Sequence, residues 1–435
     1  MDRSKREDEP LLSSSSARET PQAERSSIKS AKRRRYRFNS RQCCVVVLLI
    51  VTAGSLMSWI ALSLNIYHSK EKAVFRKAPL VDGHNDWPIW IRAYHGNHLY
   101  DGNITTTTPL PGHVDFPRLR KGRLSAQFWS AYVPCPADST NHSDPNYFLP
   151  VHDTLQQIDL IHRLITAFPT HLVAGKTSHS AWSNFGYGFH PRRITSYIGI
   201  EGLHQIGNSI STLRTYHALG VRYATLTHNC NNIFADAAIS PEGPIHNGLS
   251  PIGKKLIHEM NRMGMMVDLS HTSQDTMRDA LAVSKAPVIF SHSCAYAVCN
   301  HPRNVPDDVL DLLKDNGGVV MVTFLPDFVK CGNSSAATIE DVADHIVYIG
   351  ERIGYRHVGL GSDFDGMPKG PEGLEDVSKY PDLVRVLLKR GLGVMEAAGV
   401  IGGNVLRVMA EVEGVGRELV MTGHRPLEDE VERGW

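Results

Sequence analysis

The sequence lacks any large excess of charge of one sign. Its 46 Lys and Arg residues against 45 Asp and Glu residues leave a formal net charge of +1. It also lacks a basic patch interleaved with aromatic residues, so the usual footprint of a nucleic-acid-binding protein is excluded. Residues 413–435 are polar and lack an apolar end, which argues against a glycolipid (GPI) anchor signal. The remaining composition, 42% hydrophobic and 21% charged, is that of a globular protein.

The N-terminal part of the chain departs from this composition. Residues 1–42 contain a serine run, many charges and almost no apolar periodicity, which predicts a disordered tail. Residues 43–67 are strongly apolar and carry no charged side chain. A membrane-spanning helix needs about 20 such residues, whereas a cleaved signal peptide has an apolar core of about 7–15 residues nearer the N-terminus. We therefore expect residues 43–67 to form a retained transmembrane signal anchor in the lipid bilayer.

Flanking charges predict the orientation of this anchor. Seven basic residues and no acidic residue lie between Lys29 and Arg41, against four basic residues and one acidic residue in the stalk at 68–77. Because basic flanks favour the cytosol, we expect a single-pass type II protein with a cytosolic N-terminus and a luminal or extracellular main domain.

Sequons and cysteines fit the same secretory route. Three N-glycosylation motifs follow the predicted anchor, at Asn103, Asn141 and Asn333. Five cysteines also follow it, and in an oxidising compartment they predict two disulfides and one free thiol. Their spacing alone leaves the pairing open.

Eight short apolar runs, mostly separated by helix-like stretches, occupy residues 78–412. Six of them end at residue types that bind metals or transfer protons: LVDGHND, YIGIEG, ATLTHN, MMVDLSH, VIFSHS and VGLGSDFDG. Two more complete the set: SAQFWSAYV and GVVMVTF. In a (β/α)8 barrel the catalytic groups sit at the C-terminal ends of the strands. We therefore predict an α/β, TIM-like (β/α)8 barrel over 78–412, a polar C-terminal tail over 413–435, and a Pro-, Gly- and Thr-rich segment at 91–123 that covers the barrel mouth or forms a partner surface.

The polar residues at the run ends indicate metal chemistry. His84 and Asp86 are two residues apart, so on a strand their side chains face the same side and can hold one ion. Glu201 is either a solvent-facing strand end or a bridge between two cations, since paired metal ions about 3.5–4 Å apart need a shared anion. His271 and His292 end adjacent runs. Imidazole nitrogens with carboxylate oxygens favour Zn²⁺, although Mn²⁺ and Co²⁺ accept the same ligands.

Four further residues are candidates for roles around such a centre. His228 is either another ligand or a hydrogen-bond donor to a developing oxyanion. Asp363 lies closest to the end of the last run and is the candidate proton shuttle, whereas we expect Asp365 to be structural. Arg303 is either a surface cation, as most such arginines are, or the group that binds a substrate carboxylate.

Together these motifs resemble those of the membrane dipeptidase (renal dipeptidase) family, which are amidohydrolase-type metallopeptidase barrels. The resemblance runs from about Ala78 to about Ala410 and rests on these segments: VDGHND, AQFWSAYVPC, IGIEG, LTHNCN, NGLSPIG, LSHTS, APVIFSHSCAY, RNVPDDVL, GSDFDG and PEGLEDVSKYPDL. It implies two Zn²⁺ ions per chain, bridged by Glu201. One ion would bind His84 and Asp86, and the other His271 and His292.

The resemblance also implies residue roles and cysteine pairs. It implies that His228 contacts substrate and steadies the tetrahedral intermediate, that Arg303 binds the dipeptide carboxylate, and that Asp363 accepts and returns the proton. The disulfides that it implies are Cys135–Cys230 and Cys299–Cys331, with Cys294 free. The family's C-terminal anchor and dimer-linking cysteine have no counterpart here, so anchoring and dimerisation are not transferred and a homodimer stays open.

The expected reaction is hydrolysis of the peptide bond of dipeptides by a hydroxide between two zinc ions, with β-lactams as a further substrate class. The first alternative is another amide, lactam or N-acyl amino acid hydrolase of the same barrel family. The second is a membrane-anchored receptor or adhesion ectodomain whose metal site is a scaffold. Because a scaffold needs no proton shuttle, the presence of both His228 and Asp363 disfavours this second alternative.

Overall fold

The computed structural model describes residues 40–186 and 193–430, so the predicted tail at 1–42 lies almost wholly outside the described residues. The chain divides into two compact units, residues 1–61 and residues 62–435, and the barrel belongs to the second. The first helix, α1, spans Ser40–Lys77. Among the described residues, no helix is both long enough and apolar enough to cross a membrane. The anchor over 43–67 is thus not confirmed and stays a prediction.

Eight parallel strands form a nearly closed barrel in the order β1-β2-β4-β5-β6-β7-β8-β9, and a short β3 pairs with β4 outside this path. Their bounds are β1 Leu80–Asn85, β2 Leu124–Ser130, β3 Leu172–Ala174, β4 Ile194–Glu201, β5 Val221–Thr225, β6 Met266–Asp268, β7 Ile289–Phe290, β8 Val319–Val322 and β9 Val358–Leu360. The ring closes between the ends of β1 and β9, where the Asp86 amide donates to the Phe364 carbonyl at 2.9 Å and the Asp363 amide donates to the His84 carbonyl at 3.1 Å.

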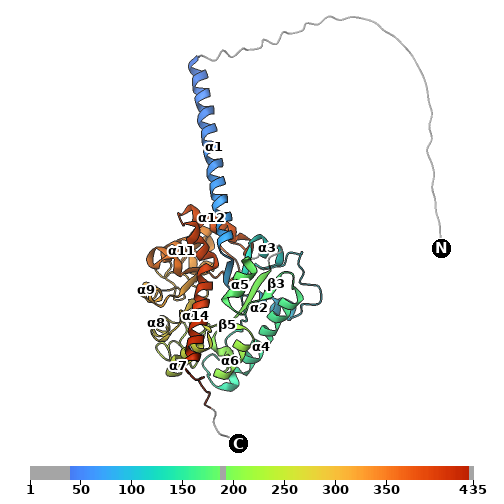
Figure 1. The fold of residues 1–435 in the computed structure, drawn as a ribbon, viewed down its shortest axis with the longest axis vertical. Helices are drawn as coiled ribbons and strands as arrows, with labels where there is room; N and C mark the ends of the chain where they lie inside the picture. The colour runs from blue at the N-terminus through green and yellow to red at the C-terminus, as the bar shows by residue number, and fades with distance from the viewer. Residues whose placement is uncertain (1–39, 187–192, 431–435) are drawn as a thin grey trace, which may run out of the picture. The chain divides into compact units, whose positions relative to one another are not determined.

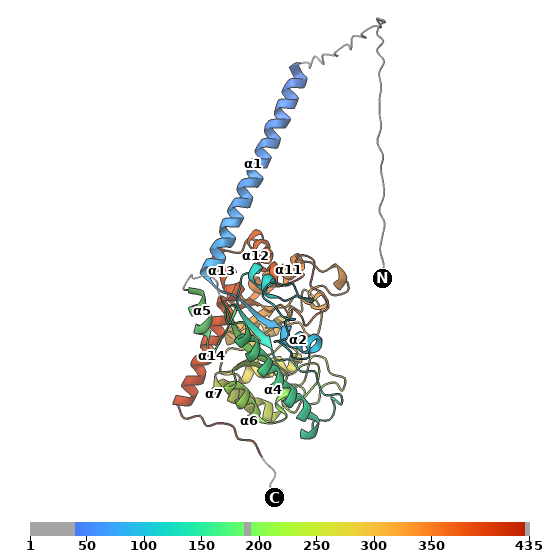
Figure 2. The same ribbon diagram turned by 90° about the vertical axis from the view of Figure 1, so that its right-hand side faces the viewer.

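Helices surround the strands, as the two side views show (Figure 1 and Figure 2). Their bounds are α2 Trp87–His95, α3 Phe116–Lys121, α4 Asp144–Ala167, α5 Ser178–Gly186, α6 Ile210–Ala218, α7 Pro251–Met263, α8 Gln274–Val283, α9 Asp307–Asn316, α10 Pro326–Val329, α11 Ile339–Ile353, α12 Tyr380–Lys389, α13 Val394–Ala398 and α14 Asn404–Met421. Local chemistry sets several ends. Ser250 caps the start of α7, which ends at the left-handed Gly264, and Thr338 with Asp341 forms a capping box on α11.

The strands are buried on both faces, as expected for a parallel sheet under helices. Inside the barrel, the Phe128 and Tyr197 rings stack with centroids 4.7 Å apart, and Tyr223 packs against Phe128 at 5.5 Å. A Cβ atom on Gly199 would lie 2.1 Å from the Tyr223 ring, so only glycine leaves room for this tyrosine. Tyr223 is therefore held with its hydroxyl near the end of β1.

The strand pattern predicted from sequence is confirmed for all eight barrel strands and their order. The short strand β3 was not predicted. The segment at 91–123 contains α3 and reaches the β9 side of the barrel, where the His113 amide donates to Asp365 Oδ1 at 2.5 Å. The polar tail was predicted to begin at Glu413, but α14 continues to Met421. Glu413 accepts hydrogen bonds from Ser178 at the start of α5, and Gly416 and Leu419 are buried farther along the helix.

Candidate metal centre and active site

Five predicted ligands converge at the C-terminal end of the barrel. His84 and Glu201 lie on β1 and β4, Asp86 follows β1, and His271 and His292 follow β6 and β7. Each side chain belongs to a residue that is at most 5% exposed. Five ionisable or metal-binding groups buried together need mutual neutralisation, because an isolated buried charge is costly.

Glu201 lies at the centre of this group. Its Oε1 atom is 3.0 Å from Nε2 of His271 and 3.3 Å from Nε2 of His292. Its Oε2 atom is 3.5 Å from Nε2 of His84 and accepts from Ser130 Oγ at 3.4 Å. Burial alone would raise the pKa of Glu201, but His84, His271 and His292 hold it well below the usual range. The carboxylate is thus ionised, with Oε1 toward His271 and His292 and Oε2 toward His84.

Each ligand histidine is oriented by a second partner at Nδ1. The three contacts are His84 to the Tyr223 hydroxyl at 2.9 Å, His271 to Asn229 Oδ1 at 3.0 Å, and His292 to Ser291 Oγ at 2.8 Å. Because an amide oxygen only accepts, His271 donates from Nδ1 to Asn229, and the same tautomer suits the other two rings. This arrangement leaves each Nε2 lone pair directed at the centre, as in metal-binding histidines.

The donor set fits divalent cations. Groups of potential ligand atoms lie within 4.8 Å of one another in three overlapping sets: His84, Glu201 and His292; Glu201, His228 and His271; and His84, Asp86 and Asp363. Nε2 of His271 is 2.9 Å from Nε2 of His292, and two neutral acceptors at that distance call for a cation or a proton beside them. Among the described residues, buried Asp86 Oδ1 has no hydrogen-bond partner. The close pair of imidazole nitrogens and the unpaired carboxylate oxygen are both expected of side chains that bind a metal ion.

Asp363 lies beside these ligands in a strained backbone conformation. Its φ angle is 67°, in the left-handed region that favours glycine, and His271 has a similar value of 65°. Burial and the neighbouring Asp86 raise the pKa of Asp363 well above the usual range, while His84 opposes this shift. A Cβ atom on Gly366 would lie 2.4 Å from both Asp363 Oδ1 and Asp86 Oδ2, so a glycine is needed beside the two carboxylates.

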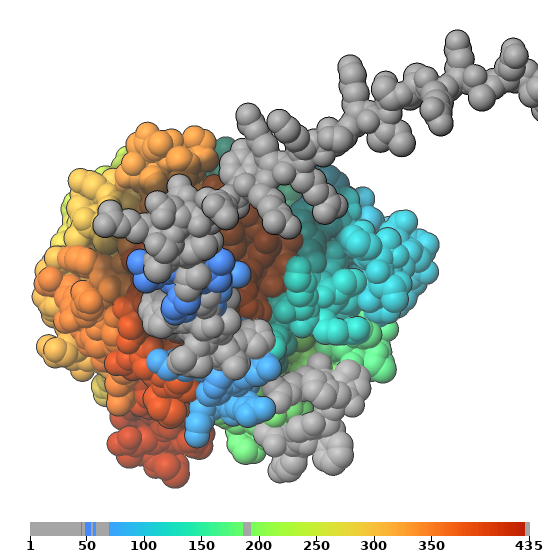
Figure 3. All heavy atoms as spheres, turned by 90° about the horizontal axis from the view of Figure 1, so that it is seen from above, coloured from blue at the N-terminus to red at the C-terminus, as the bar shows by residue number. Residues whose placement is uncertain are grey.

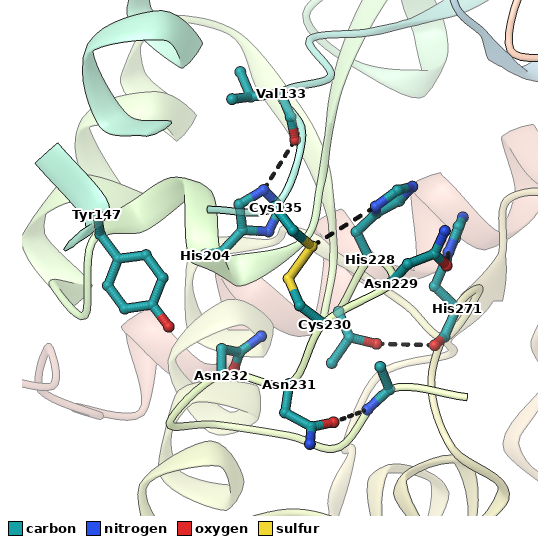
Figure 4. The surroundings of a disulfide bond; sticks show 12 residues. Val133, Cys135, Tyr147, His204, His228, Asn229, Cys230, Asn231, Asn232 and His271 are labelled. Carbon is teal, nitrogen blue, oxygen red and sulfur yellow. Dashed lines mark hydrogen bonds between the residues drawn. A yellow bond between two sulfur atoms is a disulfide. The ribbon is translucent and has the colours of Figure 1, made fainter. Parts of the chain in front are cut away.

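His228 follows β5, and its ring packs against that of His271. Its ring centroid is 4.4 Å from that of His271, and Nδ1 is 3.9 Å from Sγ of Cys135 (Figure 4). Burial lowers the pKa of His228 to about 4, so the ring is neutral at pH 7 and carries one N–H group. A neutral imidazole at this position can donate one hydrogen bond to a substrate oxygen.

Arg303 is not a surface cation. The residue is 3% exposed, and its Nε and Nη2 atoms are buried without a hydrogen-bond partner among the described residues. Its guanidinium carbon lies 5.0 Å from the centroid of the Phe328 ring. Burial lowers the pKa of Arg303 to about 10, and Asp363 and Glu201 partly oppose this shift. A buried guanidinium with unpaired donors requires an anionic partner.

The structure confirms the predicted cysteine pairs. Cys135 bonds to Cys230, Cys299 bonds to Cys331, and Cys294 is free and buried. The first disulfide joins the segment after β2 to the segment that carries His228, as Figure 4 shows. The three sequon asparagines, Asn103, Asn141 and Asn333, are exposed, and their glycosylation stays a prediction.

Several supporting residues escaped the sequence analysis. They are Asp82, Ser130, Tyr223, Asn229, Ser291 and Gly366. Asp82 is fully buried and accepts from the Ser362 amide and hydroxyl, at 2.8 and 2.7 Å, and from the Tyr380 hydroxyl at 2.7 Å. The signal for Asp82 was present in the sequence, because an acidic residue inside the apolar run LVDG is costly to bury without partners.

The barrel and this ligand set define the chain as an α/β-barrel metallohydrolase. A family model described as membrane dipeptidase (peptidase family M19) matches residues 68–422. The chain therefore belongs to the membrane dipeptidase family, and the family assignment makes it a dipeptidase-type hydrolase. The resemblance of the sequence motifs to the membrane dipeptidase family is confirmed.

Relatives and solved structures agree with this assignment. The chain is 56% identical over 366 residues to dipeptidase aclJ of Aspergillus oryzae (strain ATCC 42149 / RIB 40), covering 84% of this chain and 85% of the relative. It is 47% identical over 384 residues to dipeptidase tcpJ of Claviceps purpurea (strain 20.1), covering 87% and 88%. The crystal structure of dipeptidase AC, a metallo peptidase of family M19, superposes with a TM-score of 0.66 at 25% identity, covering 78% of this chain and 99% of that one.

Proposed function

We propose that the chain hydrolyses dipeptides with two Zn²⁺ ions, one bound by His84 and Asp86 and the other by His271 and His292, with Glu201 between them. The observation that carries this proposal is the convergence of three Nε2 atoms and two carboxylates beside a buried guanidinium without a partner. Zinc ions bound there would polarise the peptide carbonyl and supply an ionised water near neutral pH.

The surrounding residues supply the remaining chemistry. Neutral His228 offers its N–H group to the oxygen of the scissile carbonyl as charge develops on it. Asp363 is placed to take a proton from the attacking water and return it to the leaving amine. Both residues face the ligands, since His228 packs on His271 and Asp363 shares a potential ligand set with His84 and Asp86.

Arg303 sets the length of the substrate. Its unpaired donors can bind the free C-terminal carboxylate of a dipeptide, preferably through two parallel hydrogen bonds. A tripeptide would place its second peptide bond, rather than a carboxylate, at this distance from the first. The buried cation therefore favours dipeptides over longer or C-terminally amidated substrates.

Exchange of Arg303 tests this assignment. A charge-assisted bidentate contact contributes about 2–4 kcal/mol, so we expect Arg303→Gln to lower kcat/KM for free dipeptides by roughly 30–1000-fold. For the matched amidated dipeptides we expect a much smaller loss. Arg303→Lys keeps the charge and serves as the conservative control with an intermediate loss. An equal loss for free and amidated substrates would contradict carboxylate binding by Arg303.

Two further expectations accompany the proposal. β-Lactams share the amide bond and provide a second substrate class, tested by adding a penem to the same panel. We also propose the type II orientation, with residues 43–67 in the membrane. Asn103, Asn141 and Asn333 then become glycosylated during synthesis with microsomes, and endoglycosidase treatment lowers the mass of the chain. Chains that stay unglycosylated and fully sensitive to added protease would overturn this orientation.

A further inference from the structure

A cavity lies at the end of the barrel opposite the metal centre. It has a volume of about 530 Å³ and is lined by residues from the end of α1, from α3, from the starts of β2 and β4 and from the segment before β3. Four of the lining residues are cations, and we call this cavity the basic pocket: Lys72, Arg76, Arg120 and Arg123. Figure 3 views the molecule from this side, with the end of α1 in light blue and the segment that contains α3 in teal.

Among the described residues, no acidic side chain balances the charge of the basic pocket. None of its lining residues is acidic, and within 40–186 and 193–430 no ion pair involves any of the four cations. Neighbouring arginines behave differently, since Arg118 pairs with Asp115 and Arg163 pairs with Asp159, each at 2.7 Å. Four cations around one cavity repel one another, and a bound anion would relieve that repulsion.

Two contacts hold arginines of the pocket in place. The Arg123 guanidinium lies 5.0 Å from the centroid of the Phe75 ring. Nη2 of Arg120 is 3.2 Å from Nε2 of His171, which also lines the cavity. Burial and the charge of Arg120 lower the pKa of His171, so this ring accepts a hydrogen bond from the guanidinium as a neutral group.

Part of the cavity lining is apolar and buried. This part includes Phe75, Phe116, Leu124 and Ile194, each at most 6% exposed. A cationic rim beside an apolar lining suits a ligand with both an anionic group and a hydrocarbon group. A volume of about 530 Å³ lies within the usual range of small-molecule sites, about 300–1,000 Å³. A small inorganic anion would leave most of this space unused.

The basic pocket is separate from catalysis. β4 begins at Ile194 in this cavity and ends at Glu201 in the metal centre, so seven residue steps separate the two, or about 23 Å at 3.3 Å per residue. Along α1, Lys72 and Arg76 follow the predicted anchor end at Tyr67 by five and nine residues, about 8 and 14 Å. The headgroup layer of a bilayer is about 5–8 Å thick per leaflet, so on that anchor Lys72 would face lipid phosphates.

We propose that the basic pocket binds a phosphate ester of an apolar group, with the phosphate between the cations of the rim and the hydrocarbon against Phe75 and Phe116. The site itself does not depend on the membrane anchor. The anchor bears only on the source of the ligand, which is either a membrane phospholipid or a soluble alkyl phosphate.

Calorimetric titration of the full chain in uncharged detergent tests this proposal, with hexyl phosphate as the probe and inorganic phosphate as the comparison. We expect saturable binding of hexyl phosphate that is at least tenfold tighter than that of inorganic phosphate. Loss of two charge-assisted contacts in the double variant Arg120→Gln/Arg123→Gln should weaken binding about 100-fold. Lys121→Gln removes an exposed cation of α3 that does not line the cavity, and should change affinity by no more than about twofold.

The metal centre lies about 23 Å from the basic pocket, so both variants should hydrolyse dipeptides at the wild-type rate. This activity also shows that the variants are folded. Adding phosphatidic acid to the micelles separates the two sources: competition with hexyl phosphate identifies a lipid site, and its absence identifies a soluble ligand. The proposal is overturned if no saturable binding occurs, if inorganic phosphate binds as tightly, or if Lys121→Gln weakens binding as much as the double variant does.

Discussion

Replacing Tyr223 by phenylalanine removes one hydroxyl group behind the metal centre and leaves every metal-binding side chain in place. This hydroxyl lies 2.9 Å from Nδ1 of His84, and its position depends on the space left by Gly199. Burial raises the pKa of Tyr223 far above that of free tyrosine, so the hydroxyl stays protonated. In the variant, Nδ1 of His84 loses its partner in a fully buried site, and the ring is no longer held with Nε2 toward the carboxylates.

The size of the effect follows from this geometry. Removal of a hydrogen-bond partner behind a metal-binding histidine typically costs about 10–100-fold in metal affinity, or roughly 1.4–2.7 kcal/mol. We therefore expect Tyr223→Phe to bind the zinc ion at His84 about 10–100-fold more weakly. Activity should fall at limiting zinc and recover at high zinc, because no ligand and no proton-transfer group is lost.

Competition of the protein with a chromophoric zinc chelator measures this affinity. Tyr197→Phe is the matched control: Tyr197 is also buried in the barrel and stacks on Phe128, but its hydroxyl donates to the Thr177 carbonyl at 2.8 Å, away from the ligands. We expect the control to keep wild-type zinc affinity. Unchanged affinity in Tyr223→Phe, or an equal loss in both variants, would refute the assigned role of this hydroxyl.

Other outcomes follow from the same structure. Asp363→Asn should lower kcat by about 10²–10⁴-fold while zinc content stays at the wild-type level, and loss of zinc instead would show that Asp363 acts as a ligand. Burial lowers the pKa of His204 to about 4, so the folded state favours the neutral form of this residue. The unfolded chain binds that proton below pH 6.5, so from pH 6.5 to 4 this residue should cost about 1.4 kcal/mol of stability per pH unit. In urea unfolding at pH 7 and pH 5, His204→Gln should show a correspondingly smaller decrease, and an unchanged decrease would contradict this account.

Strand-end chemistry made much of the centre predictable from sequence. The two-residue spacing brings His84 and Asp86 together at the end of β1, with Nε2 of His84 3.2 Å from Asp86 Oδ2. The parallel barrel brings His271 and His292 to the same end, where Nε2 of each lies within 3.3 Å of Glu201 Oε1. The buried position of Arg303 could not be predicted from its sequence context, because most arginines in such a loop are surface cations, whereas this one is 3% exposed.

Partners contributed by distant strands were not predictable in the same way. Tyr223 reaches His84 from β5, 139 residues away, and only the barrel geometry makes them neighbours. Asn229 was overlooked although it follows His228 directly. It accepts from His271, 42 residues away, and only the folded barrel brings these two residues together. The basic pocket combines α1, α3, β2 and β4, and none of these segments alone contains a recognisable motif.

The central claim is a metal-dependent dipeptidase, and a substrate panel tests it most directly. The panel contains free dipeptides, tripeptides and amidated dipeptides, with wild type and Asp86→Ala each measured after chelation and after zinc addition. We predict cleavage of free dipeptides by the wild type alone, loss of that activity on chelation, and its return with zinc. A folded, zinc-loaded wild type that cleaves none of the dipeptides would contradict the account and point to another amide or lactam as substrate.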